Sequence, residues 1–112
     1  MPLHLFAEMH VRDFATARAW YEQLLGPPAF FAHETEAVWT LADERSVAVE
    51  ESPSHAGHCA VTVFVDDLDA YLAQIATRGL EPDDRETYSN GVRKAVFHDP
   101  DGNEFGFGGG PA

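Results

Sequence analysis

The stretch Asp99-Pro100-Asp101-Gly102-Asn103-Glu104-Phe105-Gly106-Phe107 decides the fold of this chain. Its proline and Asp-Gly pair have the chemistry of a hairpin turn. The segment 92–98 before the turn predicts one strand, and the segment 103–107 after it predicts another. The chain is therefore expected to end in two strands joined by a tight turn.

A pattern of strand followed by capped helix occurs twice, 54 residues apart. Each copy has an Asp that is placed to cap a helix, and each helix is expected to stop at a glycine, Gly26 or Gly79. The matching pairs are Val11 with Val65, Asp13 with Asp67, and Phe14 with Leu68. A repeat of this length is typical of a supersecondary unit that is used twice.

Short strands are predicted after each helix, so each half has the order strand, helix, strand, strand, strand. We expect one domain over residues 1–112, with a first module at 3–51, a linker at 52–57 and a second module at 58–108. A small βαβββ unit cannot bury a sheet face alone. The predicted fold class is α+β: two tandem βαβββ modules forming a cupped mixed β-sheet, with the helices outside.

The charge balance excludes several kinds of partner. The chain has 7 Lys and Arg against 19 Asp and Glu, a formal net charge of −12, which argues against nucleic acid and against an anionic membrane surface. The acids either keep a small protein soluble or attract a cationic ligand. One cysteine, no long apolar run and no secretory signal favour a cytoplasmic location.

These residues resemble the vicinal oxygen chelate superfamily, the glyoxalase/bleomycin-resistance/ring-cleaving dioxygenase group. The resemblance covers about the whole chain, and its most specific parts are Val11-Arg12-Asp13-Phe14, Trp20-Tyr21, Leu24-Leu25-Gly26 and the closing Asp99-Pro100-Asp101-Gly102-Asn103. It implies paired βαβββ modules and usually a dimer. In the enzymes, a divalent metal in the cup chelates two oxygens of the substrate. The drug-binding members sequester a flat, cationic antibiotic in a cleft between two subunits.

The resemblance also identifies where the metal ligands should stand. Two lie on the first strands of the modules and two on the last strands. The four positions hold Phe6, Ala48, Ala60 and Gly106. None has a donor atom in its side chain, and a divalent ion needs oxygen, nitrogen or sulfur ligands. We therefore expect no metal cofactor at these positions.

A shifted metal site is the alternative. Four residues that are possible ligands each lie two positions from a vacated one and share its face: Glu8, Glu50, His58 and Glu104. Such a set is chemically adequate for a divalent Fe, Mn, Ni or Zn ion. The competing interpretation is that they are solvated charges at strand ends.

Ligand-binding residues are predicted on the lining of the cup, together with the four vacated positions. Phe6 and Trp39 are expected to stack on a planar ligand, and Glu8 to supply an acceptor or anionic contact. Arg93 and Lys94 alternate on one strand, so one of them should face inward; an inward Arg93 would suggest a ligand carboxylate. For each of these aromatic and charged residues, an ordinary core or surface position remains the alternative.

Three functions stay open at this level. The first is a non-catalytic homodimer of the bleomycin-resistance type, which confers antibiotic resistance by enclosing a planar aromatic or cationic small molecule without a metal. The second is an enzyme of the superfamily, a lyase, isomerase or dioxygenase with relocated metal ligands. The third is a regulatory or interaction domain with a vestigial cup. Hydrolysis through a G-x-S-x-G nucleophile and nucleotide binding through a Walker loop have no support, because neither motif occurs.

Overall fold

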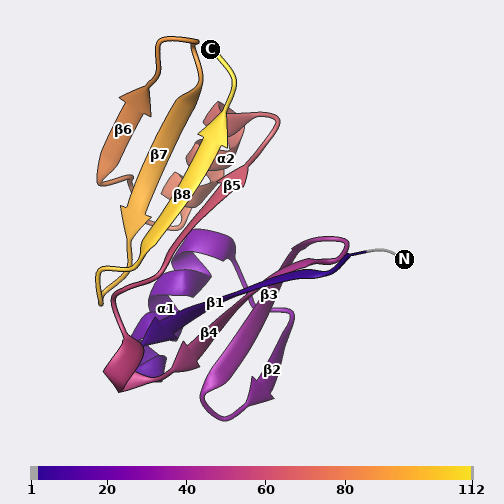
Figure 1. Cartoon of the computed structure of the whole chain (residues 1–112), viewed down its shortest axis with the longest axis vertical. Coiled ribbons are helices and arrows are strands. Elements are labelled where there is room, and N and C mark those ends of the chain that lie inside the picture. The colour runs from indigo at the N-terminus through magenta and orange to yellow at the C-terminus, as the bar shows by residue number, and fades with distance from the viewer. Residues whose placement is uncertain (1–2, 112) are drawn as a thin grey trace.

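The computed structural model describes residues 3–111 and contains two copies of one βαβββ unit (Figure 1). The first copy comprises β1 (Leu5–Val11), α1 (Phe14–Leu25), β2 (Phe30–His33), β3 (Glu36–Ala42) and β4 (Arg45–Glu51). A short 3-10 helix (Pro53–His55) leads to the second copy: β5 (Ala60–Phe64), α2 (Leu68–Thr77), β6 (Asp84–Thr87), β7 (Arg93–His98) and β8 (Glu104–Gly109). The predicted fold class is confirmed.

Each module has its own four-stranded mixed sheet. The strand orders are β1-β4-β3-β2 and β5-β8-β7-β6, and the only parallel pairs are β1 with β4 and β5 with β8 among the described residues. The registers also correspond, since Phe6 lies opposite Ser46 as Ala60 lies opposite Glu104. The repeat seen in the sequence is therefore a repeat in strand pairing as well.

The two predicted capping residues begin the two helices. Asp13 accepts hydrogen bonds from the backbone nitrogen and the hydroxyl of Thr16, at 2.9 and 2.6 Å. Those bonds stabilise the charged carboxylate and lower the pKa of Asp13. Asp67 accepts from the backbone nitrogen of Ala70 at 3.1 Å. Gly26 ends α1 with a φ of 85°, a conformation that glycine adopts without strain.

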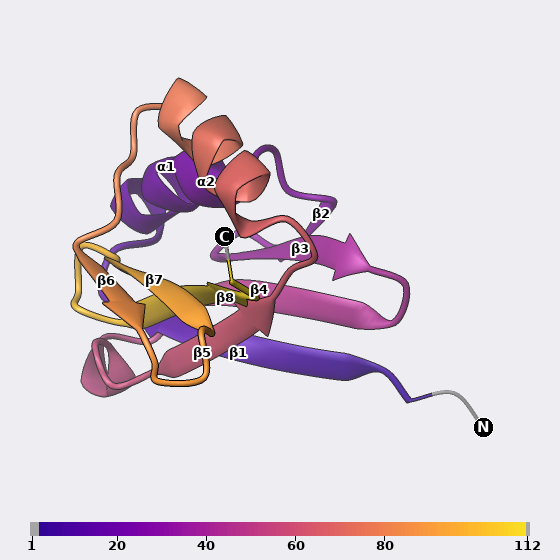
Figure 2. The ribbon, with the colours of Figure 1, turned by 90° about the horizontal axis from the view of Figure 1, so that it is seen from above.

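Both helices lie on the same side of the two sheets, as Figure 2 shows. They meet near their C-terminal ends, where the Arg78 guanidinium donates to the backbone oxygens of Gln23 at 2.6 Å and Leu24 at 2.9 Å. None of the helices in the described residues has the length and apolar character to cross a bilayer. One face of each sheet is thus covered by helices, and no helix covers the other face, which we call the open face.

The closing turn joins the modules from inside the core. The buried side chain of Asn103 donates to the backbone oxygen of His10 at 2.8 Å and to Asp99 at 2.7 Å. Its oxygen accepts from the backbone nitrogen of Cys59 at 2.9 Å. One side chain therefore ties the end of β1 to the segment before β5. The sequence predicted the closing turn only as a local feature, and the structure shows that its Asn103 also links the two modules.

Candidate functional site

The open face of module one is built by alternation along its strands. In β1, Met9 and Val11 are buried against the helices, whereas Phe6, Glu8 and His10 point to the other side. Strand pairing extends this open face across the sheet. It comprises Phe6, Glu8, His10, Glu36, Val38, Thr40, Ser46, Ala48 and Glu50, with Phe30 and His33 on the edge strand β2.

The open face of module two is formed in the same way by β5, β8 and β7. It comprises Ala60, Thr62, Phe64, Lys94, Val96, His98, Glu104, Gly106 and Gly108. Phe64 is 71% exposed, and its ring covers Gly108, where an added Cβ would lie only 2.7 Å from the ring. This face therefore offers an exposed aromatic platform over a strand that has no side chain at that point.

The four positions at which the superfamily's metal ligands are expected all lie on the open faces. Phe6 and Ala48 are on module one, and Ala60 and Gly106 on module two. Lys94 occupies the space above Gly106, because an added Cβ there would lie 2.9 Å from the Lys94 Cε. None of the four side chains has an oxygen, nitrogen or sulfur atom, so these positions do not fit a divalent ion.

Trp39 was expected to stack on a ligand, and that prediction is wrong. Trp39 is 2% exposed, and its indole nitrogen donates to the backbone oxygen of Gly26 at 2.8 Å. Val38, which lies opposite Ala48, occupies the open face instead. Alternation places Trp39 and Val38 on opposite faces of β3, and the helices cover the face that carries the larger side chain, Trp39.

The inward position predicted for Arg93 is also wrong. Its guanidinium binds Asp69 of α2 at 2.8 Å and the backbone oxygen of Gly110 at 2.9 Å, on the helix side of the sheet. Lys94 lies on the open face, since it is paired with Gly108. The cation available to a ligand on module two is therefore a flexible ammonium rather than a bidentate guanidinium.

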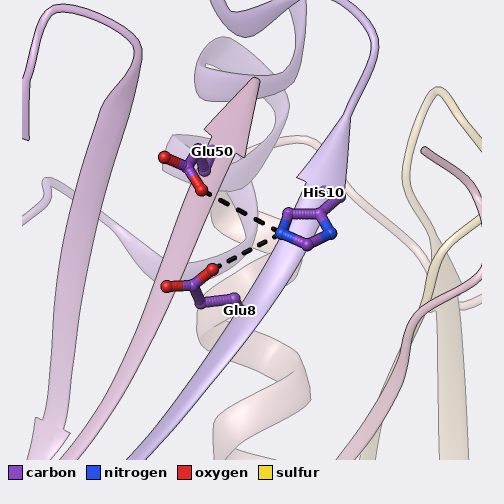
Figure 3. Close-up of side chains that lie close together, drawn as sticks. All are labelled: Glu8, His10 and Glu50. Atoms are coloured by element: carbon purple, nitrogen blue, oxygen red, sulfur yellow. Dashed lines mark ion pairs between the residues drawn. The ribbon is translucent and has the colours of Figure 1, made fainter. Parts of the chain in front are cut away.

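The shifted set of four metal ligands does not converge within the chain. Glu8 and Glu50 do come together, and His10 lies between them (Figure 3). Its Nε2 is 3.4 Å from Glu8 Oε2 and 4.0 Å from Glu50 Oε1. His58 and Glu104 belong to neither of the donor clusters found among residues 3–111.

A second triad shares Glu50 with the first. His33 Nε2 lies 3.2 Å from Glu50 Oε2 and 3.3 Å from Glu36 Oε1. Burial raises the pKa of Glu36, and the negative charges of Glu50 and Glu8 raise it further. Alternation in β1 already groups Glu8 with His10, but the roles of His33 and Glu36 follow only from the strand order.

A cleft of about 360 Å³ lies between the two modules, and most of its lining comes from the helix side of the sheets. Thr62, Phe64 and Ser46 border it from the open faces. Apolar side chains form most of its remaining wall: Leu5, Ala7, Leu41, Val47, Val61, Val63, Val65 and Tyr71. Its size and lining are those of a site for an apolar small molecule or side chain.

Comparisons with known proteins agree with this architecture. The family model described as Glyoxalase/Bleomycin resistance protein/Dioxygenase superfamily matches residues 3–107. The crystal structure of a glyoxalase/bleomycin resistance protein from Catenulispora acidiphila is 51% identical, with a TM-score of 0.94 over 98% of this chain and 100% of that one. No curated protein sequence gives a significant match.

Two more distant structures share the fold. A bleomycin-binding protein complexed with bleomycin is 20% identical, with a TM-score of 0.74 over 97% of this chain and 98% of that one. The lactoylglutathione lyase from Agrobacterium tumefaciens is 13% identical, with a TM-score of 0.75 over 98% and 95%. The fold thus occurs in both a binding protein and an enzyme, and the match over residues 3–107 shows that this chain belongs to the glyoxalase/bleomycin resistance protein/dioxygenase superfamily.

Proposed function

We propose that this protein binds a planar, cationic small molecule without converting it. The observation that carries the proposal is the chemistry of the open faces. At the positions where the superfamily's enzymes place metal ligands, this chain has Phe6, Ala48, Ala60 and Gly106. These faces are suited to hold a ligand by contact and stacking, and they do not supply the donors of the usual ion.

Exposed aromatic rings supply the contact area. Phe6 is 45% exposed on module one, and Phe64 is 71% exposed on module two. Large aromatic side chains in water are the surfaces from which stacking and burial gain the most free energy. Ala48 and Gly106 are themselves buried, and Lys94 lies above Gly106, so the contact area comes from the two rings rather than from the backbone beneath them.

Negative charge supports a cationic ligand. The net charge of −12 creates an attractive field for cations over the whole surface. Glu8 lies on the same face as Phe6 and is the nearest acid along β1. We assign Glu8 as the acceptor or anionic contact that orients the positive group of the ligand.

A homodimer would complete the site. Each chain presents two open faces on separate sheets, with β1 and β5 as edge strands. Pairing module one of one copy with module two of the other would bring two open faces together and enclose the ligand between them. The fold shared with a bleomycin-binding protein supports a small-molecule ligand for this chain.

Bleomycin and a panel of planar cationic dyes test the proposal by fluorescence or calorimetric titration. Phe6→Ala and Phe64→Ala should each weaken binding about five- to ten-fold, because each removes a stacking surface worth about 1–1.4 kcal/mol. Phe31→Ala is the matched control. Phe31 is 48% exposed, but it lies on the helix side of its sheet beneath Arg18.

Phe31→Ala should leave ligand affinity unchanged. Equal losses in all three variants would contradict a site on the open faces. A lack of binding by the wild-type protein to every probe would contradict the binding function itself. Sedimentation at micromolar protein, with and without the probe, tests the dimer.

The second candidate is a metal-dependent enzyme of the same superfamily, a lyase or dioxygenase. The observation that favours it is the pair of Glu and His triads on module one. Turnover of a thiohemiacetal or a catechol after loading with Fe, Mn, Ni or Zn, and its loss on chelation, would replace the binding function with this one.

A further inference from the structure

Three carboxylates and two imidazoles converge on the open face of module one, and Glu50 of β4 is at their centre. Its two oxygens serve different histidines, Oε1 lying 4.0 Å from His10 and Oε2 lying 3.2 Å from His33. Glu8 and Glu36 flank these histidines at 3.4 and 3.3 Å. We call these five residues the Glu50 cluster.

The donor spacing matches that of a small divalent ion. Zinc binds imidazole nitrogen and carboxylate oxygen at about 2.0–2.1 Å in a tetrahedron, so neighbouring ligand atoms are about 3.3–3.4 Å apart. In the triad of His33, Glu36 and Glu50, both contacts have this separation, at 3.3 and 3.2 Å. In the triad of Glu8, His10 and Glu50, one contact has it, at 3.4 Å, and the other is longer, at 4.0 Å. The triad of His33, Glu36 and Glu50 is therefore the better match to tetrahedral coordination, and Glu50 links it to the other triad.

The charge of the cluster is not balanced by a permanent cation. Among residues 3–111, the ion-pair partners of Glu8, Glu36 and Glu50 are histidines in every case. Glu36 is held with only 12% of its side chain exposed. Partly buried carboxylates that face one another are stabilised most by a multivalent cation among them.

We propose that the Glu50 cluster is a binding site for a divalent transition-metal ion of the zinc type. It lies two residues further along the strands than the vacated positions, with Glu8 after Phe6 and Glu50 after Ala48. Neutral imidazole with carboxylate is a donor set suited to Zn, Ni, Co or Fe rather than Ca or Mg.

Module two has no equivalent site. Strand pairing makes Thr62, Phe64 and Gly108 the counterparts of Glu8, His10 and Glu50. The proposal therefore places the metal on one module of each chain. Its test is separate from that of the small-molecule ligand, because the ion alone is the probe, although Glu8 is assigned to both sites.

Titration of the full chain with Zn²⁺, followed by calorimetry, tests the site, and Co²⁺ absorption in the visible region reports coordination directly. Glu50→Gln removes the residue shared by both triads and should weaken Zn²⁺ binding at least about 100-fold. The double variant His10→Gln/His33→Gln should have the same effect and should remove the Co²⁺ absorption.

His98→Gln is the matched control. His98 also lies between two carboxylates, Asp83 at 3.2 Å and Glu104 at 3.6 Å, but they approach opposite ring nitrogens and cannot share one ion with it. This variant should keep wild-type affinity. The proposal is overturned if wild-type protein binds Zn²⁺ no better than Glu50→Gln, or if His98→Gln loses as much affinity. Circular dichroism of each variant verifies its fold, and Glu36→Gln replaces any variant that does not fold.

Discussion

The hydroxyl of Tyr21 in α1 donates a hydrogen bond of 2.9 Å to Asp99, which lies 78 residues further along the chain. Both side chains are buried. Asp99 also accepts from the Asn103 amide and from the backbone nitrogens of Asp101 and Asn103. The helix of module one is thereby attached to the closing turn of module two, and this contact joins the modules together with the bonds of Asn103 and Arg78.

Tyr21→Phe should lower the free energy of unfolding by about 1.5–3 kcal/mol, the range for a hydrogen bond to a charged partner. Chemical denaturation at neutral pH measures the change. Tyr88→Phe is the control, since its hydroxyl makes a 3.2 Å bond to Glu86 at the surface, and it should change stability by less than about 0.5 kcal/mol. Similar losses in the two variants would contradict the structural role of the Tyr21 contact.

Alkaline pH should destabilise the protein through Tyr21. Burial raises the pKa of Tyr21 well above its usual value, and the charge of Asp99 raises it further. Above about pH 10 the unfolded chain loses this proton while the folded protein keeps it, so stability falls as pH rises. The slope for one proton is about 1.4 kcal/mol per pH unit. Denaturation between pH 9 and pH 11 should show a shallower decline for Tyr21→Phe than for wild type, and parallel declines would refute the assignment.

Asn103→Ala should be among the most damaging substitutions in the chain. It removes three hydrogen bonds and leaves the backbone groups of His10 and Cys59 without this partner in a partly buried place. We expect a loss of about 3–5 kcal/mol in unfolding free energy. Asn90→Ala, which removes one exposed bond to the backbone of Val92, should have a small effect. Thermal unfolding of both variants makes the comparison. A small loss of unfolding free energy in Asn103→Ala would contradict the proposed role of Asn103 in joining the two modules.

Two glycines of β8 should respond differently to alanine. A Cβ at Gly109 would lie 2.7 Å from the Cβ of Leu68, which α2 holds in the core, so Gly109→Ala should cost about 1–3 kcal/mol. A Cβ at Gly106 would lie 2.9 Å from the far end of the flexible Lys94 side chain, which can move away, and 3.2 Å from the Thr62 hydroxyl. Gly106→Ala should therefore change unfolding free energy by less than about 1 kcal/mol, and the reverse order would disprove this packing.

The sequence by itself determined the elements and their repetition. The capping residues Asp13 and Asp67, the stop at Gly26 and the closing turn act over a few residues, so their signals are readable without a structure. The 54-residue repeat then predicted two equal modules, and the matching registers of β1 and β5 confirm the equivalence. Local chemistry was sufficient for these features because each depends on neighbours along the chain.

Only the tertiary structure decided which face of each strand is covered. Alternation separates Trp39 from Val38 and Arg93 from Lys94, but it does not say which of each pair meets the helices. The strand order β1-β4-β3-β2 likewise brings His33 and Glu36 to Glu50, which no local pattern links. Register and strand order depend on how much apolar surface the whole chain buries, and that buried area comes from contacts between residues distant in the sequence.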